Sequence, residues 1–148
     1  MITFREATRG DVTAVVALLS DGLIGRDIGA SPEAIFETFD AMQAAGHTRL
    51  IVGQDATGRS VATYQITCLL GLSLTAPRRA VIEGVRVAGD LRGRGLGARL
   101  MADAEDRARA AGCTVIQLTT NATRQDAHRF YTREGYVPSH LGFKKPLG

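Results

Sequence analysis

The stretch from Ala80 to Gly112 holds residue types that could carry out chemistry together. It begins with an apolar run that contains one carboxylate, Glu83, and continues into a turn rich in arginine and glycine. A turn of this kind that opens a helix can point backbone N–H groups and the positive helix end at a phosphate. An acid inside an apolar strand beside it could transfer protons. The stretch therefore predicts a phosphate-bearing ligand next to a proton acceptor, which is the pattern of an enzyme.

The turn combines Gly93, Gly95 and Gly97 with Arg92 and Arg94. This spacing lacks the GxGxxG fingerprint of dinucleotide-binding folds, and no Gly-Lys-Ser/Thr of a P-loop follows it. Glycines nevertheless let the backbone approach a pyrophosphate closely and adopt positive φ. Taken alone, the pattern fits a tight strand-to-helix turn with solvated arginines about equally well.

The chain has 148 residues, which suits one ordinary domain, and we expect a single domain over residues 1–148. The net charge of +3 is spread out, with no basic run interleaved with aromatics, so nucleic acid is a poor candidate partner. No segment has the length of a membrane span, and charged residues interrupt the N-terminus early, so we expect the cytoplasm. Cys68 and Cys113 lie in apolar runs without metal-ligand spacing, and we expect reduced core residues and no metal.

Hydrophobic periodicity predicts the elements that must position these groups. Strands are expected at 2–7, 48–54, 60–70, 80–87 and 113–120, and a last strand or two from Tyr136 onward. Helices are expected from residue 8 or 11 to 19, and at 32–45, 96–111 and 124–133. The order predicts an α+β fold with a mixed sheet flanked by about four helices.

The connector between the first two helices, residues 22–30, is rich in glycine and ends at Ser31 and Pro32, a good helix start. Such a connector could form a lid or a substrate wall, and an ordinary connector is an equally good interpretation. Its one basic residue is Arg26, which argues mildly against a groove for acidic peptides.

Two runs in this chain resemble motifs of the GNAT superfamily of N-acetyltransferases. The run IEGVRVAGDLRGRGLGARLM resembles motif A, whose Arg/Gln-x-x-Gly-x-Gly/Ala pattern is matched by Arg92, Gly95 and Gly97. The run DAHRFYTREGY resembles motif B, with Ala127, Phe130, Tyr131, Gly135 and Tyr136 in the family's places. The order of elements also matches, so the resemblance covers nearly the whole chain up to Pro138.

The resemblance implies a single-domain GNAT fold, with a mostly antiparallel sheet that splays at the cofactor site, and acetyl-CoA as co-substrate without a metal. It also implies a bulge near Gly84 or Val85, where the strands separate. In the family the end of the catalytic strand pairs with the pantetheine arm, and the glycine loop holds the pyrophosphate. The cofactor-binding residues it implies are Val85, Arg86, Val87, Arg92, Gly93, Arg94, Gly95, Leu96, Gly97 and Ala98.

Glu83 is the candidate general base. Unbroken alternation would place it on one face with Val81, Val85 and Val87, an apolar setting in which a carboxylate accepts protons more readily near neutral pH. It would remove a proton from the substrate ammonium, through water, so that the neutral amine attacks the thioester. The alternative is a structural acid paired with Arg86 or Arg124.

Tyr131 is the candidate general acid, because it matches the family tyrosine that protonates the departing CoA thiolate. The alternative is a packed aromatic side chain. The family often has an asparagine seven residues earlier that contacts the cofactor, and here Arg124 holds that place, with Asn121 just before it. Either residue could substitute, so both are candidate cofactor-binding residues, whereas His128 is left out of the chemistry.

These features predict an acetyl-CoA-dependent N-acetyltransferase that acts by direct attack of a small-molecule primary amine in a ternary complex. Alternatives are a protein or peptide N-acetyltransferase and a non-catalytic CoA-binding module, in which Glu83 and Tyr131 are structural. Small-molecule relatives in the family include acetyltransferases for aminoalkylphosphonates. Similar proteins commonly dimerise, so a homodimer is possible.

Overall fold

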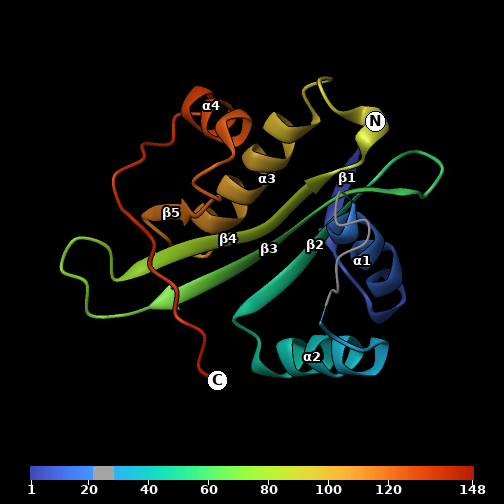
Figure 1. Cartoon of the computed structure of the whole chain (residues 1–148), viewed down its shortest axis with the longest axis horizontal. Coiled ribbons are helices and arrows are strands. Elements are labelled where there is room, and N and C mark those ends of the chain that lie inside the picture. The colour runs from blue at the N-terminus through green and yellow to red at the C-terminus, as the bar shows by residue number, and fades with distance from the viewer. Residues whose placement is uncertain (22–28) are drawn as a thin grey trace. The chain divides into compact units, whose positions relative to one another are not determined.

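The computed structural model describes residues 1–21 and 29–148. It divides into two compact units, residues 1–117 and residues 118–148. The first unit contains most of a five-stranded sheet with the order β1-β2-β3-β4-β5 (Figure 1). Within the described residues, the α-helices and strands are β1 (Thr3–Glu6), α1 (Val12–Ser20), α2 (Pro32–Ala45), β2 (Thr48–Gln54), β3 (Ser60–Leu70), β4 (Arg78–Val87), α3 (Leu96–Ala110), β5 (Val115–Leu118) and α4 (Gln125–Arg133).

The sheet is mixed. The pairs β1–β2, β2–β3 and β3–β4 are antiparallel. Between β4 and β5 the chain passes through α3, and the Thr114 N–H donates to the Arg78 carbonyl at 3.0 Å, which joins the beginnings of the two strands. Strands that begin side by side run parallel, and a helical crossover is the usual connection between parallel neighbours. The α+β fold with a mixed sheet expected from the sequence is confirmed, and the described residues contain four α-helices, in line with the expected number of about four.

Local sequence signals account for most element boundaries. The Ser31 hydroxyl accepts a hydrogen bond from the Ala34 N–H, Pro32 occupies the first turn of α2, and Gly46 ends that helix with φ of 81°. The bounds of β2 and β3 agree with the expected 48–54 and 60–70. The expectation of a further strand from Tyr136 onward is wrong, because residues 134–148 form no strand. Pro138 and Gly142 interrupt this segment, and both residues disfavour strands.

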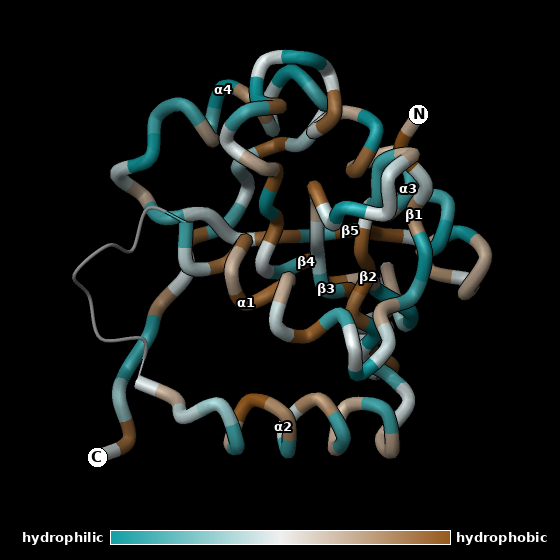
Figure 2. The backbone as a smooth tube through the Cα atoms, turned by 90° about the vertical axis from the view of Figure 1, so that its right-hand side faces the viewer, coloured by the Kyte–Doolittle hydropathy of each residue, from teal (hydrophilic) through white to brown (hydrophobic). Residues whose placement is uncertain are grey.

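The two faces of the sheet are covered by different helices. Tyr64 of β3 points to α3, because its hydroxyl donates to Asp103 of that helix. Its neighbours Thr63 and Gln65 therefore point to the opposite face. On that face Val52, which lies opposite Thr63, packs in a buried cluster with α1 and α2. Figure 2 shows that α2 alternates between hydrophilic and hydrophobic positions, as a helix with one covered face should.

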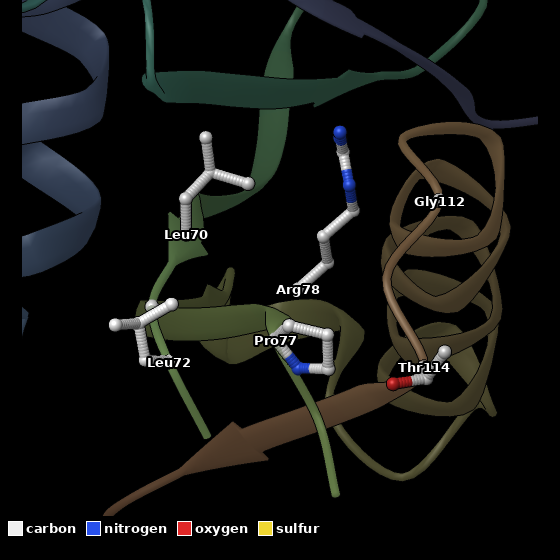
Figure 3. Close-up of a pocket in the computed structure, with 7 residues that line it drawn as sticks. Leu70, Leu72, Pro77, Arg78, Gly112 and Thr114 are labelled. Carbon is white, nitrogen blue, oxygen red and sulfur yellow. The ribbon is translucent and has the colours of Figure 1, made fainter. Parts of the chain in front are cut away.

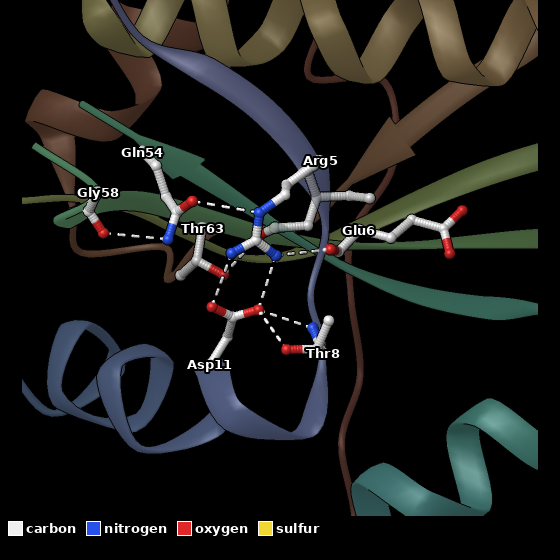
Figure 4. Close-up of polar contacts among 8 residues, drawn as sticks. Arg5, Glu6, Thr8, Asp11, Gln54, Gly58 and Thr63 are labelled. Carbon is white, nitrogen blue, oxygen red and sulfur yellow. Dashed lines mark hydrogen bonds and ion pairs between the residues drawn. The ribbon is translucent and has the colours of Figure 1, made fainter. Parts of the chain in front are cut away.

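An ion pair fixes β1 to the beginning of α1 on this face (Figure 4). The Arg5 guanidinium donates to both carboxylate oxygens of Asp11, at 2.7 and 2.9 Å. The Thr8 N–H and hydroxyl donate to Asp11 Oδ2 as well, at 2.7 and 3.1 Å. Because the side chain of Asp11 is only 11% exposed, these bonds replace most of its contact with water.

The Arg5 guanidinium holds the pKa of Asp11 at about 2, against 3.8 in the absence of these contacts. A lowered pKa means that the pair stabilises the fold fully above about pH 4 and loses its effect as the pH falls through 2. We expect the free energy of unfolding to fall by about 2 kcal/mol over this window. Urea unfolding at a series of pH values measures it, and Asp11→Asn should flatten the curve there.

The control for this measurement is Asp40→Asn. Asp40 pairs with Arg9 at 3.2 Å, but both side chains are more than half exposed, so the pair contributes little. Its pH dependence should remain that of the wild type. An Asp11→Asn variant that keeps the wild-type slope between pH 4 and 2 would contradict the role assigned to the Arg5–Asp11 pair.

Candidate active site

The candidate base lies on β4 next to a break in the pleat. In the β3–β4 register Gln65 lies opposite Glu83 and Thr63 lies opposite Arg86, so two residues of β4 face one residue of β3. This is a β-bulge at Gly84 and Val85, as expected. Gly84 adopts φ of 61°, which suits glycine, and a Cβ there would come within 3.3 Å of Leu19 of α1.

The bulge corrects the expected surroundings of Glu83. Unbroken alternation would align Glu83 with Val85 and Val87, whereas the extra residue places Arg86 on its face instead, since Thr63 and Gln65 point the same way. Glu83 is exposed rather than set among valines, and the Gln65 amide donates to its Oε2 at 2.9 Å. The alternative is that Glu83 is a structural acid paired with an arginine. Among the described residues, Glu83 is bonded to the amide of Gln65 and not to an arginine.

The glycine-rich turn forms a backbone cradle at the start of α3. A short 3-10 turn, Gly89–Leu91, follows β4, and Gly93 and Gly95 then adopt φ of 75° and 77°. Gly95 is the N-cap of α3, and it has no side chain to satisfy the first N–H groups. The first turn also carries no acidic residue. The N–H groups of Leu96, Gly97 and Ala98 are thus left for an anion at the positive end of a fifteen-residue helix.

Two ion pairs hold this loop to other elements. Arg59, in the β2–β3 turn, donates to both oxygens of Asp90 at 2.8 and 2.9 Å. Arg92 donates to Asp21, just after α1, at 2.8 Å. Arg59, and the exposed Arg94 further away, keep the pKa of Asp90 below its usual value. Sequence reasoning missed Asp21, Arg59 and Asp90, because no local pattern signals a pair that spans thirty or more residues.

The conformation of Gly95 gives a direct test of the cradle. An alanine with φ of 77° is strained by about 1–2 kcal/mol, although a Cβ would meet no atom within 4 Å. We expect Gly95→Ala to weaken acetyl-CoA binding about 10-fold, because relief of the strain turns the N–H groups away from the phosphates. Isothermal titration measures the affinity.

Gly46→Ala is the matched control, since Gly46 has φ of 81°, equally open surroundings and a place at the end of α2. It should lower stability by a similar amount and leave the affinity for acetyl-CoA as it is. Equal affinities of the Gly95→Ala variant and the wild type would contradict the assignment of the cradle.

The remaining candidates belong to the second unit. Tyr131 lies on α4, and its ring makes edge-to-face contacts with Phe130 and Tyr136 at centroid distances of 5.0 and 5.9 Å. Arg124 is the N-cap of α4 and reaches Asp126 at 3.5 Å. The side-chain oxygen of Asn121 accepts hydrogen bonds from the N–H and hydroxyl of Thr123, so it shapes the turn before α4. His128 is bonded to the Asn121 carbonyl at 3.1 Å and takes part in the same turn.

Described residues line a cavity near each end of β4. One, of about 460 Å³, is lined by Leu70, Leu72, Pro77, Arg78, Gly112 and Thr114 (Figure 3). It lies where β4 begins, whereas the glycine loop follows the end of that strand, so the cavity is separate from the candidate site. The other, of about 810 Å³, adjoins the loop, with Asp21, Arg59, Ala88 and Gly89 in its lining.

The two cysteines lie near each other at the β4 start. Both are half-buried thiols, and burial, followed by contact with Cys68, raises the pKa of Cys113. A raised pKa keeps a thiol protonated and less reactive.

Within residues 1–21 and 29–148, no group of three histidine, cysteine or acidic side chains could hold a metal ion. In the same residues, no helix has the length and apolar character needed to cross a membrane. The connector at 22–30, interpreted either as a lid or substrate wall or as an ordinary connector, lies mostly outside the described residues, as does Arg26.

Comparison with known proteins identifies the family. The sequence profile of the Acetyltransferase (GNAT) family matches residues 28–136. The chain is 48% identical over 66 residues to the aminoalkylphosphonate N-acetyltransferase of Salmonella typhimurium, a match over 45% of this chain and 43% of that protein. It is 34% identical over 94 residues to an uncharacterized N-acetyltransferase of Bacillus subtilis, over 58% of this chain and 66% of that protein. Both alignments thus span less than two thirds of the curated relatives.

Among solved structures, a transcriptional regulator from Bacillus halodurans C-125 superposes with a TM-score of 0.89 and 36% identity. The match covers 99% of this chain and all of that one. The family profile spans both the glycine-rich cradle at α3 and the aromatic cluster on α4, which are the two runs that resemble the family's motifs. The chain belongs to the GNAT family of acetyltransferases.

Proposed function

We propose that this protein transfers the acetyl group of acetyl-CoA to a primary amine of a small molecule, by direct attack in a ternary complex. The observation that carries the proposal is the N-terminus of α3, which has no side-chain cap and is preceded by two glycines of positive φ, Gly93 and Gly95. Such a cradle suits a pyrophosphate, since its N–H groups and the helix dipole both favour negative charge. Acetyl-CoA carries a pyrophosphate and is the acetyl donor of this family.

The donor would lie along the end of β4. Backbone groups of Val85, Arg86 and Val87 would pair with the pantetheine arm, next to the bulge that interrupts pairing with β3. The pyrophosphate would be held by the loop from Arg92 to Ala98. Arg92 and Arg94 are exposed and add positive charge there, although Arg92 would have to share its guanidinium with Asp21. Asn121 or Arg124 of the second unit would add a further cofactor contact.

In the acetyl transfer the substrate nitrogen loses two protons and the CoA sulfur gains one. Glu83 would accept a proton from the substrate ammonium, through water, and the neutral amine would then attack the thioester carbonyl. As the C–N bond forms and the C–S bond breaks, the CoA thiolate would take a proton from the Tyr131 hydroxyl. The second proton of the attacking nitrogen would then pass through water to the Tyr131 oxygen, and the proton on Glu83 would leave to solvent. Positioning and backbone N–H groups would supply the rest of the rate enhancement, and no covalent enzyme intermediate is needed.

The acceptor is proposed to be a small molecule. The alignment with a Salmonella typhimurium protein named aminoalkylphosphonate N-acetyltransferase supports this, at 48% identity over 66 residues. The structural match to a protein described as a transcriptional regulator is the reason to keep a non-catalytic CoA-binding module as the second candidate.

The test is CoA release by the purified protein, measured with acetyl-CoA and a panel of primary amines, lysine-containing peptides included. Turnover of small amines supports the proposal, and preferential turnover of peptides would replace it by a peptide acetyltransferase. Tight acetyl-CoA binding without turnover of any amine would favour the binding module.

A further inference from the structure

One row of residues crosses the sheet beside the candidate base and carries an arginine at each end. The strand registers align Arg5 with Val52, Val52 with Thr63, and Thr63 with Arg86. All four side chains point to the face that α1 and α2 cover, opposite to Tyr64 and α3. The two arginines thus occupy comparable places on one face and can be compared directly.

The two arginines differ in their counter-charges. The carboxylate of Asp11 neutralises Arg5 through two hydrogen bonds. The side chain of Arg86 donates to the carbonyl of its neighbour Val85, at 2.8 Å, and no carboxylate pairs with it among the residues that the structure describes. Arg86 is nevertheless half-buried. A half-buried guanidinium that no described carboxylate neutralises has donors and charge available for an anionic ligand.

The bulge is what brings this cation to the candidate base. Glu83 and Arg86 are three residues apart, so in an unbroken strand they would point to opposite faces. The extra residue at Gly84 and Val85 places Glu83 opposite Gln65 and Arg86 opposite Thr63, which lie two positions apart on one face of β3. Their backbone positions are therefore about 7 Å apart along the strand. The structure leaves the two groups unpaired, since Glu83 is bonded to Gln65 instead.

An acid and a cation at this separation can each bind one end of a short zwitterion. The ammonium end would lie at Glu83, where it loses its proton, and an anionic end would reach Arg86 across a short carbon chain. A guanidinium binds carboxylate, sulfonate and phosphonate oxygens through paired hydrogen bonds, which sets orientation as well as affinity.

We propose that the acceptor is a small primary amine that carries an anionic oxygen group, and that Arg86 binds this group while Glu83 faces the amine. This inference rests on the proposed acetyl transfer and names the class of its acceptor. Arg86 then has two functions, because its backbone would lie on the donor side and its side chain determines acceptor specificity.

The experiment compares 3-aminopropanoate, 2-aminoethanesulfonate and 2-aminoethylphosphonate with the uncharged amines 1-aminopropane and 2-aminoethanol, by CoA release. The wild type should turn over at least one anionic amine with a kcat/KM about 10- to 100-fold above the uncharged amines, the range for hydrogen bonds to a charged group. Arg86→Gln should remove most of this preference, mainly through KM for the anionic amine. Arg86→Lys should restore part of it.

The matched control is Arg79→Gln. Arg79 lies opposite Leu69, on the same face of β4 as Glu83. It precedes Glu83 by four residues, so it lies on the side of Glu83 away from the bulge. It should leave the preference as it is. If Arg79→Gln removes the preference and Arg86→Gln does not, the anionic group binds at Arg79 rather than at Arg86, and the inference fails.

The remaining outcomes separate this inference from the proposed function. Turnover of uncharged amines with no preference for anionic ones would overturn the inference and leave acetyl transfer standing. Absence of CoA release with every amine would overturn both. Thermal unfolding of each variant shows whether a lost preference comes from a damaged fold. If Arg86→Gln is unstable, Arg86→Lys replaces it as the test: a folded Arg86→Lys variant that keeps part of the preference supports the inference, and one that keeps none overturns it.

Discussion

Replacing Glu83 with glutamine is expected to lower kcat about 100-fold at neutral pH, the lower range for loss of a general base. Glutamine keeps the size of the side chain and can still bond to Gln65, whose amide now donates to the Glu83 carboxylate. It cannot accept the ammonium proton. CoA release under saturating acetyl-CoA and amine measures the change.

The pH profile distinguishes this catalytic role from a structural one. A free alkylamine has a pKa near 10, so at alkaline pH more of the acceptor is already neutral and less depends on a base. The deficit of Glu83→Gln should therefore shrink as the pH rises toward that value. The control is Glu6→Gln. Glu6 is an exposed carboxylate on β1 that pairs with Arg49, and both residues are far in the sequence from the bulge. A deficit that stays constant with pH would show that Glu83 only maintains the structure.

Replacing Tyr131 with phenylalanine is expected to lower kcat by a comparable factor, about 100-fold, with little change in the KM for acetyl-CoA. The substitution removes the hydroxyl whose proton the departing thiolate would take and keeps the aromatic ring. The ring contacts with Phe130 and Tyr136 remain available, so α4 should keep its structure. Steady-state kinetics at saturating amine separate kcat from KM.

Tyr136→Phe is the matched control, because Tyr136 belongs to the same aromatic cluster and lies just beyond α4. Its kcat should stay near the wild-type value. Equal losses in the two variants would mean that the cluster matters for structure rather than for proton donation. A Tyr131→Phe variant with full activity would remove the general acid from the mechanism.

The elements whose bounds the sequence predicts correctly are those that depend on neighbouring residues. The start of α2 at Ser31 and Pro32, its end at Gly46 and the bounds of β2 and β3 agree with expectation. Each depends on a cap, a ring or an alternating pattern that lies within a few residues. The last strand was predicted wrongly because residues after Tyr136 carry strand formers but also a proline and a glycine that interrupt them.

The site was predicted unevenly for the same reason. The glycine loop and the start of α3 lie where the motif indicates, since close backbone approach and positive φ are local properties of glycine. The apolar surroundings expected for Glu83 were wrong, because counting by twos along β4 ignores the residue that the bulge adds. The resemblance implied that bulge, but only the strand register shows which side chains it moves to the other face.

The sequence by itself determined the local elements, the phosphate cradle and the membership of a family, because these depend on residue types within short windows. Only the tertiary structure decided which charges meet. It pairs Arg5 with Asp11, Arg59 with Asp90 and Arg92 with Asp21. It also places Arg86 on the same face as Glu83, although neither Glu83 nor any other described carboxylate pairs with Arg86. Such pairs depend on strand register and helix packing, which join residues that are far apart in the chain.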